Sequence, residues 1–137
     1  MRKLVIGSLL VALGLSNGAG QNASSPGSTL RIALVGQALI HEDLRRVAPF
    51  AVEQAKGYLQ GADVRFTNLE TALAPKDMVV EPRTPGVHRT EPEVLDALKD
   101  MGFNLLSLSN NHAWDLGAKG LLATIGEVSK RSFARPR

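Results

Sequence analysis

Two patterns of apolar residues alternate along the chain from Leu30 onward. Short apolar runs at 30–35, 63–66 and 103–108 predict three strands, and the first, which is mainly apolar and bounded by Gly36, is predicted to be a buried strand. The segments that follow these runs carry apolar residues at three- and four-residue spacing, which predicts amphipathic helices. The order strand, helix, strand, helix, strand, helix is typical of an α/β fold with a parallel sheet and crossover helices.

The first predicted helix covers about 44–59. Pro49 lies early in this segment and marks an alternative start, because proline is tolerated in a first helical turn and is costly deeper in a helix. Gly61 closes the helix. After the second strand, residues 74–85 contain several prolines and no apolar period, so we expect a long loop there.

Three residues indicate where the second predicted helix begins. Thr90 can cap it, Pro92 suits its first turn, and Glu93 completes a capping box. Gly102 ends it. The last predicted helix begins near residue 117 and continues to about residue 128.

The N-terminal residues predict export. Arg2 and Lys3 precede an apolar stretch at 4–15, which is followed by a cleavage region of small residues. This is the pattern of a secretory signal peptide over 1–20, with cleavage near Gly20 or Ala23. The apolar stretch is shorter than the ~20 residues that span a bilayer, so an uncleaved membrane tether is the weaker alternative. We therefore expect a periplasmic or extracellular protein in which a linker, 21–29, precedes one domain, 30–130.

Charge and cysteine content narrow the class of function. The formal net charge is +3, but the signal region holds two basic residues and the last seven residues hold three, and removing these five cations leaves a body of charge −2. With few aromatic residues and no basic stripe, this composition excludes a nucleic-acid surface. The chain contains no cysteine, so neither a disulfide nor a lipidated cysteine anchor is available.

Polar residues follow each predicted strand. Gly36 and Gln37 follow the first, Asn68 and Glu70 the second, and the run 109–112 (Ser, Asn, Asn, His) the third. Such residues individually are common turn, solvated or structural groups. Parallel strands bring their carboxyl ends to one edge, where a carboxylate, amide oxygens and an imidazole could form one crevice of a metal-assisted hydrolase.

Longer stretches of sequence carry a family resemblance. The segments RIALVGQALI, GADVRFTNLET and HRTEPEVLDALKDMGFNLLSLSNNHAWDLGAKGLLATI resemble the capsule synthesis CapA family, also called poly-gamma-glutamate synthesis proteins. The resemblance covers about 30–128 and is most specific in SNNHAWDLGAKGLL. It implies the N-terminal part of a calcineurin-like metallophosphoesterase fold, a layered parallel-sheet fragment of an α/β/β/α domain, and a metal-dependent phosphoesterase-like hydrolase.

The resemblance also implies roles for individual residues. Asn68, Glu70 and Asn111 would line a site for divalent metal ions of unknown identity, and His112 would stabilise or protonate the reacting phosphate ester. Asp115 would cap the next helix or support a ligand. The implied substrate is an anionic polymer or a phosphoester, and the implied partner is a membrane-bound polymer synthase. The alternative is a non-catalytic factor that binds or exports the polymer at the membrane face.

Two departures from the family pattern affect these expectations. Gln37 stands where most relatives have aspartate; His41, Glu42 or Asp43 could substitute for it, although a solvated helix N-terminus explains the acidic pair equally well. Relatives continue with further strands and histidines, and the tail 131–137 is unlike that continuation. We therefore expect a truncated, inactive domain whose tail results from a shifted reading frame or a truncated gene, and whose exposed sheet edge promotes association.

Overall fold

The structure is a computed structural model that describes residues 29–79 and 85–134. The predicted signal peptide and residues 21–28 of the predicted linker lie outside the described residues. No helix of the described segments is long and apolar enough to cross a membrane.

A three-stranded parallel sheet forms the centre of the molecule. Its strands are β1 (Ile32–Ala38), β2 (Val64–Leu69) and β5 (Leu105–Ser107), in the spatial order β1, β2, β5. All pairs are parallel, with Leu34 opposite Phe66 and Phe66 opposite Leu105. The predicted α/β fold with a parallel sheet is confirmed.

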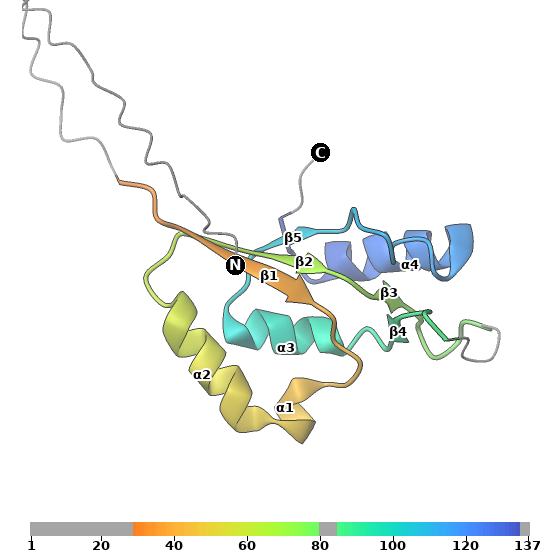
Figure 1. Cartoon of the computed structure of the whole chain (residues 1–137), viewed down its shortest axis with the longest axis horizontal. Helices are drawn as coiled ribbons and strands as arrows, with labels where there is room; N and C mark the ends of the chain where they lie inside the picture. The colour runs from red at the N-terminus through yellow and green to blue at the C-terminus, as the bar shows by residue number, and fades with distance from the viewer. Residues whose placement is uncertain (1–28, 80–84, 135–137) are drawn as a thin grey trace, which may run out of the picture.

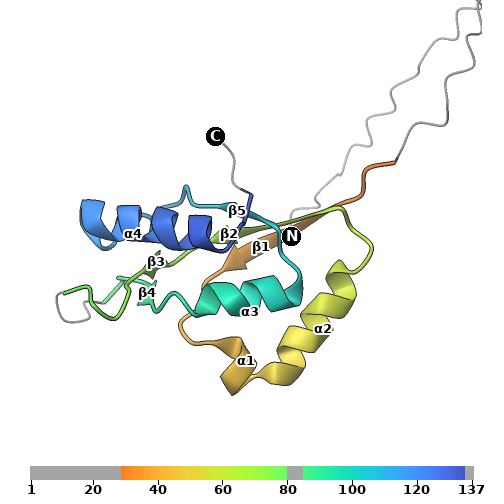
Figure 2. The ribbon, with the colours of Figure 1, turned by 180° about the vertical axis from the view of Figure 1, so that it is seen from behind.

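Helices cover both faces of this sheet. Figures 1 and 2 show α4 (Gly117–Lys130) on one side, and α1 (Leu44–Val47), α2 (Pro49–Leu59) and α3 (Val94–Met101) on the other. Leu106 of the sheet, Leu95 of α3 and Val128 of α4 are fully buried. The core therefore lies between the sheet and the two helix layers. Burial of each such side chain contributes about 1.5–3 kcal/mol to stability.

The first strand is not buried, and this prediction was wrong. β1 forms an edge of the sheet, and three of its apolar side chains are exposed: Ile32 (55%), Leu34 (77%) and Val35 (44%). The apolar run correctly indicated a strand, but an edge strand gains burial only where another element lies over it. β1 also continues past Gly36, with a register shift between Leu34 and Gln37 that brings Gln37 opposite Asn68.

The segment predicted as one helix over 44–59 consists of two. Ala48 between them has φ −150° and ψ 58°, which is not helical, and α2 begins at Pro49. Proline restricts the residue before it to extended conformations and has no N–H to continue a helix. The alternative start at Pro49 is therefore confirmed.

A second, two-stranded sheet lies beyond the carboxyl edge of the first. β3 (Ala72–Leu73) pairs in parallel with β4 (Arg89–Thr90); β3 directly precedes the loop predicted over 74–85, and β4 contains the predicted helix cap Thr90. The predicted capping box at Thr90 is wrong, because α3 begins at Val94 and Thr90 Oγ1 instead donates to the His41 carbonyl at 2.9 Å. A tertiary partner outcompetes the local cap here.

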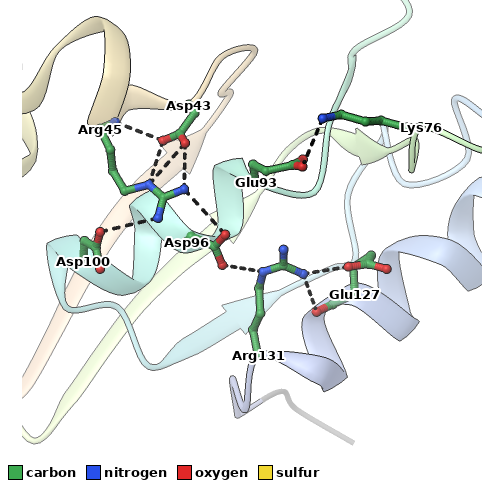
Figure 3. Close-up of polar contacts among 8 residues, drawn as sticks. All are labelled: Asp43, Arg45, Lys76, Glu93, Asp96, Asp100, Glu127 and Arg131. Atoms are coloured by element: carbon green, nitrogen blue, oxygen red, sulfur yellow. Dashed lines mark hydrogen bonds and ion pairs between the residues drawn. The ribbon is translucent and has the colours of Figure 1, made fainter.

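Residues 131–134 belong to the folded structure. Ala134 bridges to Leu105 beside β5, and Phe133 is buried with the Lys99 ammonium 4.9 Å from its ring centroid. Figure 3 shows Arg131 between α3 and α4, where its guanidinium contacts Asp96 at 2.6 Å and Glu127 at 2.7 Å. These contacts tie the end of α4 to the opposite layer.

Candidate functional site

The carboxyl ends of the three strands lie side by side. Gln37 of β1 is opposite Asn68 of β2, and Asn68 is opposite Ser107 of β5. The loops that follow β2 and β5 carry Glu70 and His112. The topology therefore brings the three groups of strand-end residues to one edge, as the order of elements predicted.

Glu70 is the buried carboxylate of this edge, with 6% of its surface exposed. Its Oε2 accepts hydrogen bonds from Gln37 Nε2 and, at 3.4 Å, from Asn68 Nδ2. Two side-chain amides thus compensate the desolvation of one carboxylate, which would otherwise be costly. Gln37 stands beside Glu70 as a hydrogen-bond donor, a role that an aspartate could not fill while ionised.

Asn110 connects the β5 loop to this network. Its Nδ2 donates to Asn68 Oδ1 at 3.1 Å and to the Leu69 carbonyl at 2.8 Å, while its Oδ1 accepts from the His112 backbone N–H at 2.9 Å. Asn110 therefore fixes the β5 loop against the end of β2. Asn111, the predicted metal ligand, is exposed; its role as a ligand remains a prediction.

His112 is held by a carboxylate from its own loop. Its Nδ1 lies 2.9 Å from Asp115 Oδ2, and both side chains are largely buried, at 17% and 13% exposure. When Nδ1 carries the proton it donates to Asp115, which leaves Nε2 as the ring nitrogen able to exchange a proton with a ligand. Leu116, rather than Asp115, is the N-cap of α4, so Asp115 supports His112 and is not a cap.

The residues considered as substitutes for the missing first-strand aspartate lie elsewhere. Asp43 caps α1 by accepting from the Arg45 N–H at 3.0 Å, and the hydrogen bond from the Arg45 side chain lowers the pKa of Asp43. Glu42 is exposed. His41 turns toward His88, with Nε2 3.3 Å from His88 Nδ1. Asp43 therefore acts as a helix cap, the alternative that the sequence left open.

The arrangement does not fit a complete metal centre. Among residues 29–79 and 85–134, no group of three histidine, cysteine or acidic side chains could hold a metal ion. The amides of Gln37 and Asn68 direct nitrogen toward Glu70, and Asn68 Oδ1 is occupied by Asn110. Glu70 is thus the single carboxylate of this network, and it is already hydrogen-bonded.

The sequence patterns do not assign two residues of the site. Asn110 alone indicates a turn, although a strand-end amide next to the Asn111–His112 pair is well placed to join neighbouring loops. No pattern points to His88, but it is one of only three histidines in the chain. Its backbone N–H donates to Asp115 Oδ2 at 2.6 Å, and its ring meets that of His112 edge to face at 4.3 Å between centroids.

The family model described as "Bacterial capsule synthesis protein PGA_cap" matches residues 31–135. Three relatives match parts of the chain. The PGA biosynthesis protein CapA of Bacillus subtilis (strain 168) is 43% identical over 45 residues, which is 33% of this chain and 12% of that protein.

Two further relatives come from Sinorhizobium fredii (strain NBRC 101917 / NGR234). The uncharacterized protein y4sH is 29% identical over 111 residues, 77% of this chain and 24% of that protein. The uncharacterized protein y4uA is 38% identical over 72 residues, 48% of this chain and 15% of that protein. The matches thus span between 12% and 24% of the length of these relatives.

Proposed function

Because the chain belongs to the bacterial capsule synthesis family PGA_cap, we propose that it forms one wall of a phosphoester-hydrolysing site that acts outside the cytoplasm in capsule or poly-gamma-glutamate assembly. Its substrate would be a phosphoester or an anionic polymer, and a membrane-bound polymer synthase would be its partner. The observation that carries the proposal is the His112–Asp115 pair, joined through Asn110 to the Asn68–Glu70 strand end.

His112 has the surroundings of a general acid. Asp115 Oδ2 lies 2.9 Å from Nδ1, which fixes the orientation of the ring. As water attacks the phosphorus and the phosphoester bond breaks, a His112 imidazolium can deliver its Nε2 proton to the departing oxygen while Nδ1 keeps its hydrogen bond to Asp115. General acid catalysis of this kind contributes about 10²–10⁴-fold to a rate.

A divalent metal ion remains a proposal that rests on Glu70 alone. When bound, such an ion would polarise phosphoryl oxygens. To ligate it, the amides that now donate to Glu70 would have to turn their oxygens toward the ion, and additional anionic ligands would be needed. Trp114, the single tryptophan, is 63% exposed within the same loop as His112 and can report binding by fluorescence.

The metal is tested by titrating the full-length chain with Mn²⁺ while Trp114 fluorescence is recorded. We expect saturable quenching that is lost in Glu70→Gln and retained in Tyr58→Ala, since Tyr58 is exposed on α2. Quenching that is unaffected by Glu70→Gln would remove Glu70 as the ligand.

Hydrolysis is tested on a full-length family member that carries the same Asn-Leu-Glu and Asn-Asn-His sequences, with the present chain assayed in parallel. The substrate is bis-p-nitrophenyl phosphate in the presence of Mn²⁺. Replacing the histidine equivalent to His112 by alanine is expected to lower kcat by about 100-fold or more. A family member that cleaves no phosphoester and binds no divalent metal would contradict the enzymatic proposal.

A non-catalytic polymer-binding or export role is the second candidate. The observation in its favour is the hydrogen bond from Gln37 to Glu70, which satisfies the carboxylate without a metal. The two functions differ in their effect on polymer output. If alanine at the positions of Glu70 and His112 leaves output unchanged in cells that depend on this protein, binding is favoured over chemistry.

A further inference from the structure

All three histidines of the chain meet at the carboxyl edge of the sheet, although they are far apart in the sequence. His41 follows β1, His88 precedes β4 and His112 follows β5. The ring centroids of His41 and His88 are 5.2 Å apart, and those of His88 and His112 are 4.3 Å apart. His88 is the middle member, in contact with both of the others.

The backbone of His88 is fixed on both sides. Its N–H donates to Asp115 Oδ2 at 2.6 Å, and its carbonyl accepts from the Ala72 N–H at 2.9 Å. Ala72 lies two residues after Glu70, so the pairing of β3 with β4 places His88 between the Glu70 strand end and the His112 loop. Any residue other than proline at position 88 can form these two backbone bonds.

The side chain of His88 is also constrained on both sides. Its Nδ1 lies 3.3 Å from His41 Nε2, and the backbone of His41 is in turn held by Thr90, whose hydroxyl donates to the His41 carbonyl at 2.9 Å. On the other side, the His88 and His112 rings are perpendicular, with an interplanar angle of 90°. Edge-to-face pairs of this kind are a preferred geometry of aromatic rings, so the contact favours one relative orientation of the two rings.

One oxygen atom serves both histidines. Asp115 Oδ2 accepts from the His88 backbone and lies within hydrogen-bonding distance of the His112 ring. Asp115 restrains one edge of the His112 imidazole, and the His88 ring packs against it from another direction. A ring held only at Nδ1 can still rotate about that contact, whereas a ring that is also packed by a neighbour has one orientation.

We propose that His88 is a positioning residue that holds the imidazole of His112 in a single orientation, with His41 bracing His88 from behind. The proposal deepens the function proposed above, since an acid that must reach the leaving oxygen of a phosphoester has to be oriented. His88 acts through packing, so an aromatic ring of similar shape can replace it. Its role does not require that His88 touch the substrate.

The test uses side-chain NMR of the full-length chain and measures no activity, so it is independent of whether the chain hydrolyses phosphoesters. Correlations of the His112 ring are recorded at one fixed pH in the wild type, His88→Ala and His88→Phe. In His88→Ala we expect the His112 signals to lose their ring-current shift and to broaden through exchange between orientations. In His88→Phe, which keeps an aromatic ring at this place, we expect a single sharp set to return.

His41→Ala provides a second variant in case His88→Ala folds poorly, because it leaves His88 in place and removes only its brace. It should broaden the His88 signals strongly and those of His112 less. Unchanged His112 signals in His88→Ala would overturn the proposal. So would signals in His88→Phe that are as perturbed as those in His88→Ala, since the ring contact would then have no part in orienting His112.

Discussion

The Asp115 side chain contacts both His88 and His112 through one oxygen atom. Its Oδ2 accepts from the His88 N–H at 2.6 Å and contacts His112 Nδ1 at 2.9 Å. Asp115→Ala removes the acceptor for both, so we expect about 1–3 kcal/mol lower stability. The equivalent change in a full-length family member should lower phosphoester hydrolysis about 10-fold.

Asp115→Asn is the matched variant, because an asparagine Oδ1 still accepts the two hydrogen bonds while the charge is lost. It should retain most of the stability measured by chemical denaturation, and the equivalent change in a full-length family member should still lower phosphoester hydrolysis, because the charge is lost. Equal stability of Asp115→Ala and the wild type would show that the loop does not depend on this side chain.

Thr124 joins α4 to β3 through its buried hydroxyl. Oγ1 accepts from the Leu73 N–H at 2.9 Å and donates to the Gly120 carbonyl at 2.9 Å. Thr124→Val keeps the shape but leaves the Leu73 N–H without its acceptor, so unfolding in urea should show a loss of about 1–3 kcal/mol. Thr124→Ser, which keeps the hydroxyl, should lose clearly less stability than Thr124→Val. Equal losses of stability in the two variants would mean that the effect comes from packing and not from the hydrogen bond.

Some residues of the site could be predicted from the sequence because a general rule places them. Glu70 and His112 follow strands, and parallel strands bring their carboxyl ends to one edge. The contacts of Asn110 and His88 depend on loop conformations that tertiary contacts stabilise. Such loop conformations are not indicated by any periodic pattern of apolar residues in the sequence. The preference for Asn110 over Asn111 in the network likewise depends on which side chain the turn directs inward.

At the scale of elements, Arg131 links α4 to α3 through Glu127 and Asp96. The hydrogen bond from Lys130, followed by that from Arg131, lowers the pKa of Glu127 although burial opposes the shift. Because the folded pKa is below the unfolded one, this stabilisation is present above the ordinary glutamate pKa of about 4.3 and is lost as pH falls through the folded value.

Arg131→Met should therefore lower stability by about 1 kcal/mol at neutral pH. The difference between this variant and the wild type should shrink as the pH falls below the ordinary glutamate value and through the lowered folded pKa of Glu127. Thermal unfolding across pH measures both effects. Lys119→Met, an exposed change on the same helix, is the control. A difference that is constant with pH would mean that the Arg131 contribution is packing rather than charge.

The elements that could be predicted well from the sequence are those whose position is determined by nearby residues. Apolar spacing located α3 and α4, Gly102 ends α3 with φ 100°, and Pro49 begins α2. The two-residue strands β3 and β4 are too short to show an alternation of apolar and polar residues. They form because they pair with each other through backbone hydrogen bonds. Thr90 illustrates the same limit, because its hydroxyl binds the His41 carbonyl rather than the helix start.

At the scale of the whole molecule, β1 leaves one edge of the sheet open and carries exposed apolar side chains. Its Leu34 is 77% exposed. Open strand edges with apolar surface favour association, so sedimentation velocity of the full-length chain should show larger species as concentration rises. Leu34→Lys should shift the distribution toward monomer, while Tyr58→Lys, at an equally exposed site on α2, should not. A sharp, reversible thermal transition of monomeric wild-type chain would contradict this expectation.

The proposed function requires above all that the three strand ends form one phosphate-binding wall. The direct measurement is a titration of the isotope-labelled full-length chain with inorganic phosphate, followed by backbone amide NMR. We predict saturable shifts confined to 68–70, 88 and 110–115, which weaken in His112→Ala. Shifts that cluster at the opposite edge of the sheet, near Gly61 and Gly102, or shifts that persist unchanged in His112→Ala, would contradict the account.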